Sequence, residues 1–173
     1  MAHKYIPGMK PGVGTQPATV PPAGTGALLE AYLAARYEVR GPAGPVVLRI
    51  GEAAPPALAE AQPAGRWTLL TAWNPGSRPR DDASNRQADA ALQAELDALG
   101  LRRLPASSSD GSGQWHEPGW LVADLGTAGA DALARRYGQA GILHWPTDGS
   151  VRLRMYLARP AGVAASPWVD WVE

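Results

Sequence analysis

From residue 66 onward, short apolar segments and amphipathic segments follow one another in the order strand, helix, strand, strand, helix, strand, strand. The first six elements of this order predict a ferredoxin-like (βαββαβ) sandwich of the α+β class, with helices on one face of a mixed sheet. A doubly wound α/β fold is the alternative, but it requires more alternation of strands and helices than this chain contains. A helix and a β-hairpin before residue 66 are predicted to decorate the sandwich.

The individual segments are assigned from apolar periodicity and turn residues. Residues 66–73 are nearly continuous in apolar and β-branched side chains, as expected of a central strand. A long helix that starts after Asp81 ends before Gly100, and its apolar residues recur every three or four positions. Residues 105–119 are rich in Ser and Gly and are interpreted as a loop. The other predicted helices cover residues 26–36, 55–62 and 127–137, and the other predicted strands cover residues 37–40, 46–50, 101–104, 120–125, 141–145 and 151–157.

The chain is long enough for one domain with a buried core, because it has 173 residues. Residues 1–25 contain five Pro and four Gly without an apolar period, which predicts a disordered or loosely docked arm. Residues 26–158 are predicted to form the single α+β domain, and residues 159–173 a C-terminal tail. Trp168 and Trp171 in this tail are costly to expose and are expected to pack back on the domain.

Composition excludes several classes of function. The chain has no Cys, so thiolate chemistry and disulfides are absent. Its formal net charge is zero, which argues against a general nucleic-acid or membrane-surface binder. It has neither an apolar run long enough to span a membrane nor a secretory signal, so a cytoplasmic location is expected. The three His lack metal-ligand spacing and no Gly-rich segment follows a strand, so neither a metal nor a cofactor is predicted.

A candidate site lies at the turn that follows the strand of residues 66–73. The turn begins with Asn74 and Pro75, and loops at strand ends are common positions for functional side chains. When the apolar stripe of the following helix is extended backwards, Asn85 falls on its inward face in the first turn, where it points toward Asn74. Two carboxamides at this point can hold a polar ligand. They can equally satisfy the backbone of an ordinary turn, and the sequence leaves both interpretations open.

The segments Leu70–Ser77 and Leu92–Gly100, together with Asn85, resemble the bacterial family known as domain of unknown function 3293. Trp115–Pro118 and Tyr137–Ala140 resemble later signatures of that family, and the resemblance covers residues 30–157. It implies a small bacterial α+β protein and assigns no activity. The polar positions of the family fall on Thr71, Asn74, Ser77, Asn85, Glu117 and Gln139.

The leading hypothesis is a protein that binds a small polar ligand or partner at the Asn74–Pro75 turn. Hydrogen bonds to the ligand are expected from Thr71, Asn74, Ser77 and Asn85, with Glu117 and Gln139 beside them and Trp73 as an apolar wall. One alternative is a hydrolase that uses Glu117 or His116 with Ser77. Another is a nucleic-acid-associated protein that uses a strand face formed by Arg152, Arg154 and Tyr156. The sequence does not define the ligand or the oligomeric state.

Overall fold

A computed structural model describes residues 24–113 and 115–172. Residues 1–23 of the predicted arm lie outside the described residues, and the predicted domain boundaries stay predictions. The helices are α1 (Thr25–Ala34), α2 (Pro56–Ala61), α3 (Asp82–Ala98) and α4 (Thr127–Arg136), with a short 3-10 helix η1 (Pro75–Ser77). The strands are β1 (Arg36–Gly41), β2 (Gly44–Leu48), β3 (Arg66–Leu70), β4 (Arg103–Ser109), β5 (His116–Ala123), β6 (Gly141–Pro146), β7 (Leu153–Met155) and β8 (Val169–Trp171). Within the described residues, no helix has the length and apolar character needed to cross a membrane.

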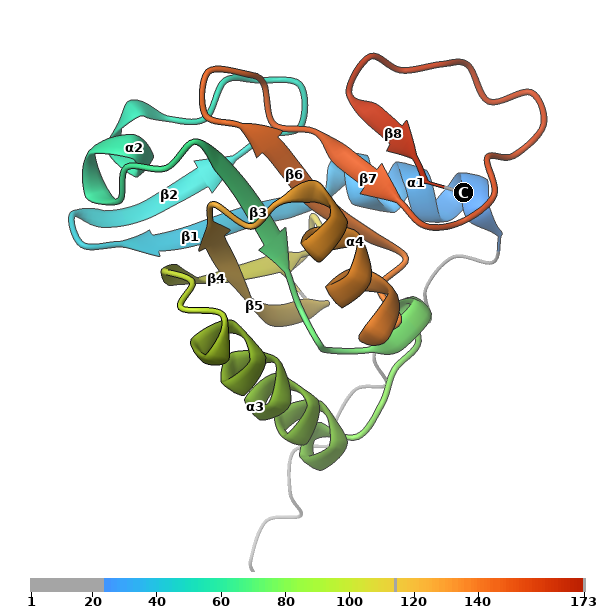
Figure 1. Cartoon of the computed structure of the whole chain (residues 1–173). Helices are drawn as coiled ribbons and strands as arrows, with labels where there is room; N and C mark the ends of the chain where they lie inside the picture. Colours follow the sequence, from blue (N-terminus) through green and yellow to red (C-terminus); the bar gives the residue numbers. More distant parts are fainter. Residues whose placement is uncertain (1–23, 114, 173) are drawn as a thin grey trace, which may run out of the picture.

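The described strands form one eight-stranded sheet in the order β2-β1-β4-β5-β3-β6-β7-β8, which curls into a half-barrel (Figure 1). Every pair is antiparallel except β7 and β8, so the sheet is mixed. The α+β content is as predicted, but the predicted ferredoxin-like sandwich is wrong. The N-terminal hairpin does not decorate a smaller sheet, because β1 pairs with β4 and thereby continues the sheet.

The helices lie on both faces of the sheet, which corrects the predicted placement on one face. Alternate side chains of β3 point to opposite faces, as in any strand. Trp67 and Leu69 enter a core with Leu29 of α1 and Leu58 of α2. Leu70 enters a second core, whose helical members are Leu92 and Leu96 of α3 and Ala130, Leu133 and Ala134 of α4. Both faces of β3 are therefore buried, which explains its nearly continuous apolar sequence.

The predicted loop of residues 105–119 is the main error in the assignment of elements. Residues 105–109 belong to β4, and residues 116–119 belong to β5. The two strands form a hairpin in which Ser109 pairs with His116. Pro105 is accommodated because β1 pairs only with residues 106–109, so no β1 residue stands opposite Pro105. A loop at this position would have left β1 paired with β2 alone, and this is why the sequence indicated a separate hairpin.

The C-terminal residues complete the other edge of the sheet. β8 pairs in parallel with β7, and Arg152 forms a two-point ion pair with Asp170. Arg154 forms a second two-point pair with Asp131 of α4, and the hydroxyl of Tyr156 donates to the same carboxylate at 2.7 Å. The charges of the predicted nucleic-acid face are therefore paired within the chain, with both side chains of the Arg154–Asp131 pair largely buried.

His144 connects the sheet to α4 and predicts a pH dependence. Its ring nitrogens are hydrogen-bonded to the hydroxyls of Thr68 and Thr127 at 2.9 and 3.0 Å. Burial, reinforced by the positive charge of Arg154, lowers the pKa of His144 from its ordinary 6.5. The unfolded chain therefore takes up this proton first as the pH falls, and the free energy of unfolding is expected to decrease below about pH 6.5. Urea unfolding across this range should show a shallower decrease for His144→Gln, and an unchanged decrease would contradict the assignment.

Candidate functional site

The turn after β3 has a left-handed backbone at three of its four residues. Asn74, Gly76 and Ser77 have φ of 47°, 63° and 56°. This region is open to glycine but costs about 1 kcal/mol or more for most other residues, so Ser77 holds a strained conformation. The backbone N–H of Gly76 donates to the carbonyl of Gly138 at 2.7 Å, which fastens the turn to the end of α4. The turn is therefore held from outside and presents Asn74 and Ser77 in fixed positions.

Asn74 and Asn85 lie together, as the sequence predicted, and they bond to each other. The Nδ2 of Asn85 donates to the Oδ1 of Asn74 at 3.0 Å. The Oδ1 of Asn85 accepts from the backbone N–H of Asn74 and from the Nε of Arg80. The Oδ1 of Asn74 accepts in addition from the backbone N–H of Arg80. Because each oxygen faces a backbone donor, the orientation of both amides is fixed by the network.

The two amides form a continuous hydrogen-bonded path from a guanidinium to a carboxylate, which we name the amide path. Arg80 donates to Asn85, Asn85 donates to Asn74, and the Nδ2 of Asn74 donates to the Oε1 of Glu117 at 2.8 Å. All three donors point toward Glu117, so the bonds polarise one another in the same direction. The path uses the carboxamide atoms of Asn74 and Asn85 and ends at the partly buried carboxylate of Glu117.

Glu117 carries the unusual electrostatics of the site. Its Oε1 accepts from Asn74 and, at 3.0 Å, from the indole Nε1 of Trp115. Burial raises the pKa of this carboxyl from 4.5 to about 7, although both hydrogen bonds act in the opposite direction. Oε2 accepts no hydrogen bond from the described residues and is not among their fully buried unpartnered atoms, so solvent reaches it. Near neutral pH, the partly buried carboxyl of Glu117 therefore exchanges between its protonated and charged forms.

The hydroxyls of Tyr32 in α1 and Ser77 in the turn form a pair, and Tyr32 lies within electrostatic reach of this carboxylate. The hydroxyl of Tyr32 is 3.4 Å from the Oγ of Ser77. Burial raises the pKa of Tyr32 to about 12, and the negative charge of Glu117 adds to this effect. Burial also raises the pKa of Tyr37 of β1, and the charge of Glu117 adds to this effect. The hydroxyl of Tyr37 donates to the carbonyl of Tyr32 at 2.8 Å. Neither tyrosine was predicted at the site, because Tyr32 in α1 and Tyr37 in β1 lie far from the turn in sequence and no local pattern connects them to it.

Thr71 and Gln139 have structural contacts instead of an open polar group, and the indole nitrogen of Trp73 is buried. The hydroxyl of Thr71 donates to the carbonyl of Pro118 and accepts from the N–H of Trp73. Gln139 is buried, and its Nε2 donates to the carbonyls of Trp73 and Tyr137 at 3.1 and 3.4 Å. The indole Nε1 of Trp73 is buried without a hydrogen-bond partner among the described residues. These side chains position the turn from both ends.

His116 does not join the other residues of the predicted hydrolase. It is exposed, and it precedes Glu117 on β5, so the two side chains point to opposite faces of the sheet. Ser77 has Tyr32 as its hydroxyl partner, with no imidazole bonded to it among the described residues. The same part of the chain contains no group of three or more His, Asp or Glu side chains that could hold a metal ion.

A known protein family matches the part of the chain that contains the site. Residues 70–142 match the sequence model of a family described as "Protein of unknown function (DUF3293)", which is the family that the motifs predicted. The matched segment includes the turn, the amide path and Glu117. No curated protein and no solved structure matches the chain.

Proposed function

We propose that this chain, whose residues 70–142 match the sequence model of the DUF3293 family, binds a small polar ligand at the carboxylate of Glu117. The ligand donates a hydrogen bond to Oε2, and the hydroxyl of Tyr32, which is paired with Ser77, lies within electrostatic reach of the same carboxylate. The observation that carries the proposal is the unequal use of the two carboxylate oxygens. Oε1 accepts from both Asn74 and Trp115, whereas Oε2 has no partner among the described residues.

The surroundings of Glu117 support a binding role more than a structural one. A carboxylate that only fastened a turn would be expected to place both oxygens on protein donors, whereas Oε2 is left open to solvent. The amide path holds Oε1 in place and so fixes where Oε2 points. Strained backbone at Ser77 is also typical of residues whose position serves a site. In this proposal Asn74 and Asn85 position Glu117 and do not contact the ligand.

The NMR signal of the Trp115 indole N–H provides a direct test, because this group is hydrogen-bonded to Glu117. Titration of the full chain with methylammonium, urea and ethylene glycol, above the pKa of Glu117, should shift this signal saturably for at least one of them. Each probe donates hydrogen bonds, and together they cover charged and neutral ligands. The shift is expected to disappear in Glu117→Gln, in which a neutral carboxamide replaces the carboxylate.

The matched control is Glu52→Gln, which removes the same charge at an exposed position. Its response to the probes should equal that of the natural chain. If no probe moves the Trp115 signal at concentrations up to the molar range, or if Glu117→Gln responds like the natural chain, the proposed ligand site is wrong.

A further inference from the structure

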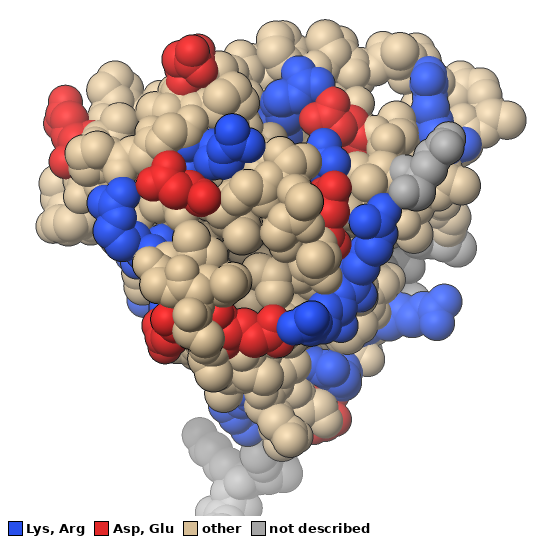
Figure 2. All heavy atoms as spheres, in the orientation of Figure 1, with Lys and Arg blue, Asp and Glu red and all other residues tan. Residues whose placement is uncertain are grey.

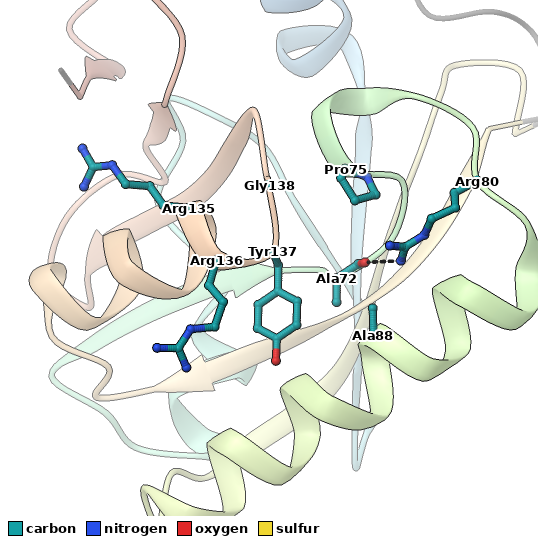
Figure 3. A pocket seen from close by; sticks show the side chains of 8 residues that line it. All are labelled: Ala72, Pro75, Arg80, Ala88, Arg135, Arg136, Tyr137 and Gly138. Carbon is teal, nitrogen blue, oxygen red and sulfur yellow. Dashed lines mark hydrogen bonds between the residues drawn. The ribbon is translucent and has the colours of Figure 1, made fainter.

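The turn after β3 borders a surface hollow on the side where Arg80 lies. This hollow of about 330 Å³ separates the turn from α3 and α4 (Figure 3). Ala72, Pro75 and Ala88 form its apolar wall, and the ring of Tyr137 stands between the two helices. Its volume lies within the range of about 300–1000 Å³ that is usual for small-molecule sites. We name it the arginine hollow, after the residues that give it its charge.

The ionisable groups that line the arginine hollow, apart from Tyr137, are all basic. They are Arg80, Arg135 and Arg136. Figure 2 shows basic side chains gathered over the C-terminal end of α4, where two of these arginines lie. Arg136 is paired with Glu95 of α3 at 2.5 Å, and Glu95 also accepts from the hydroxyl of Tyr137. Glu95 therefore neutralises one of the arginines from the rim.

Arg80 is the part of the hollow that lacks a counter-charge. Its side chain donates to two neutral acceptors, the carbonyl of Ala72 at 3.2 Å and the Oδ1 of Asn85 at 3.1 Å. None of the ion pairs among the described residues includes Arg80. A guanidinium has five N–H donors in a fixed plane, so these two bonds fix its orientation and leave three donors unused. A half-buried cation held in this way gains from an anion.

We propose that the arginine hollow binds a small molecule that carries a phosphate or carboxylate group. The unused donors of Arg80 hold its oxyanion, Arg136 adds attraction from α4, and the rest of the molecule lies against Tyr137 and Pro75. This site lies at the Arg80 end of the amide path, opposite the Glu117 end, and takes an anion. It stands or falls independently of the ligand proposed above, because its evidence comes from Arg80 and the hollow alone.

The test is a titration of the full chain with inorganic phosphate at constant ionic strength, followed by the backbone amide NMR signals of Ala88 and Tyr137. The natural chain should show saturable shifts. Glu95→Gln, which frees Arg136, should tighten phosphate binding about threefold, and Arg136→Gln should weaken it by a similar factor. Arg80→Gln should abolish it, and the amide spectrum of that variant will show whether the turn has kept its structure.

The controls change the net charge equally at another ion pair of α3. Asp97 pairs with Arg103 at 2.5 Å, and neither residue lines the hollow. Asp97→Asn and Arg103→Gln should leave the affinity for phosphate nearly unchanged. If Asp97→Asn tightens binding as much as Glu95→Gln does, the attraction comes from net charge alone and the proposed site is wrong. Absence of saturable shifts at Ala88 and Tyr137 in the natural chain would also overturn it.

Discussion

Replacing Asn85 with alanine is expected to lower the free energy of unfolding by about 3 kcal/mol, with urea denaturation as the measurement. Asn85 is 1% exposed and makes four side-chain hydrogen bonds, with both the backbone and the side chains of Asn74 and Arg80. Its truncation removes the partner of two donors and of the carbonyl of Arg80 in a place that water reaches poorly, while the Oδ1 of Asn74 keeps only the N–H of Arg80. Each such group costs about 1–3 kcal/mol, and the effects are less than additive where water can partly replace the side chain.

Gln87→Ala is the matched control, because Gln87 is exposed on the same helix. Its effect should stay within about 0.5 kcal/mol, as for most surface substitutions. A loss below about 1 kcal/mol in Asn85→Ala would mean that water takes over the network. The amide path would then contribute little to the stability of the turn, and the fixed direction of Oε2 would lose its physical basis.

The sequence predicted the meeting of Asn74 and Asn85 because both positions follow from local rules. The end of β3 places the turn, and the helical period of α3 places Asn85 on the inward face. The sequence did not decide between the ligand and the backbone as the partner of these amides. That choice depends on Arg80, which supplies two donors and one acceptor to the pair. Nothing in the spacing of Arg80 distinguishes it from Arg78, which is exposed.

The order of the strands in the sheet was harder to predict from the sequence than the individual helices and strands. Most helices and strands were predicted within a few residues, since each depends on periodicity and turn residues near in sequence. The sheet order depends instead on long-range pairing, such as that of Val39 in β1 with Ala106 in β4. The Ser-rich segment of β4 has little intrinsic strand signal, so its strand structure comes from its neighbours on both sides. Tyr32 and Tyr37 could not be assigned to the site, because no local pattern connects them to the turn.

The stability of the chain should depend on pH through Glu117. Its pKa is about 7 in the folded chain and 4.5 when the group is unperturbed. Between these values the folded chain holds a proton that the unfolded chain has released, so the free energy of unfolding decreases as the pH rises through this range. Below pH 4.5 the contribution is fully present, and above about pH 7 it is lost. The difference corresponds to roughly 3 kcal/mol, which is the free energy needed to keep the carboxylate charged in this position.

Glu117→Gln removes this titration and keeps an oxygen acceptor for Asn74 and Trp115. Urea unfolding measured from pH 4.5 to above pH 7 should therefore show a smaller decrease with rising pH in the variant than in the natural chain. The NMR signal of the Trp115 indole N–H in the natural chain should titrate with a midpoint near pH 7, and the variant should show no such transition.

His144 acts with the opposite sign in the same range, since its protonation destabilises the fold at low pH. The double variant with His144→Gln separates the two, because the sites lie on different strands with no shared partner and their effects should add. A Trp115 midpoint close to 4.5 would show that Glu117 is solvated like a surface carboxylate, and the site would lose the group on which its proposed chemistry depends.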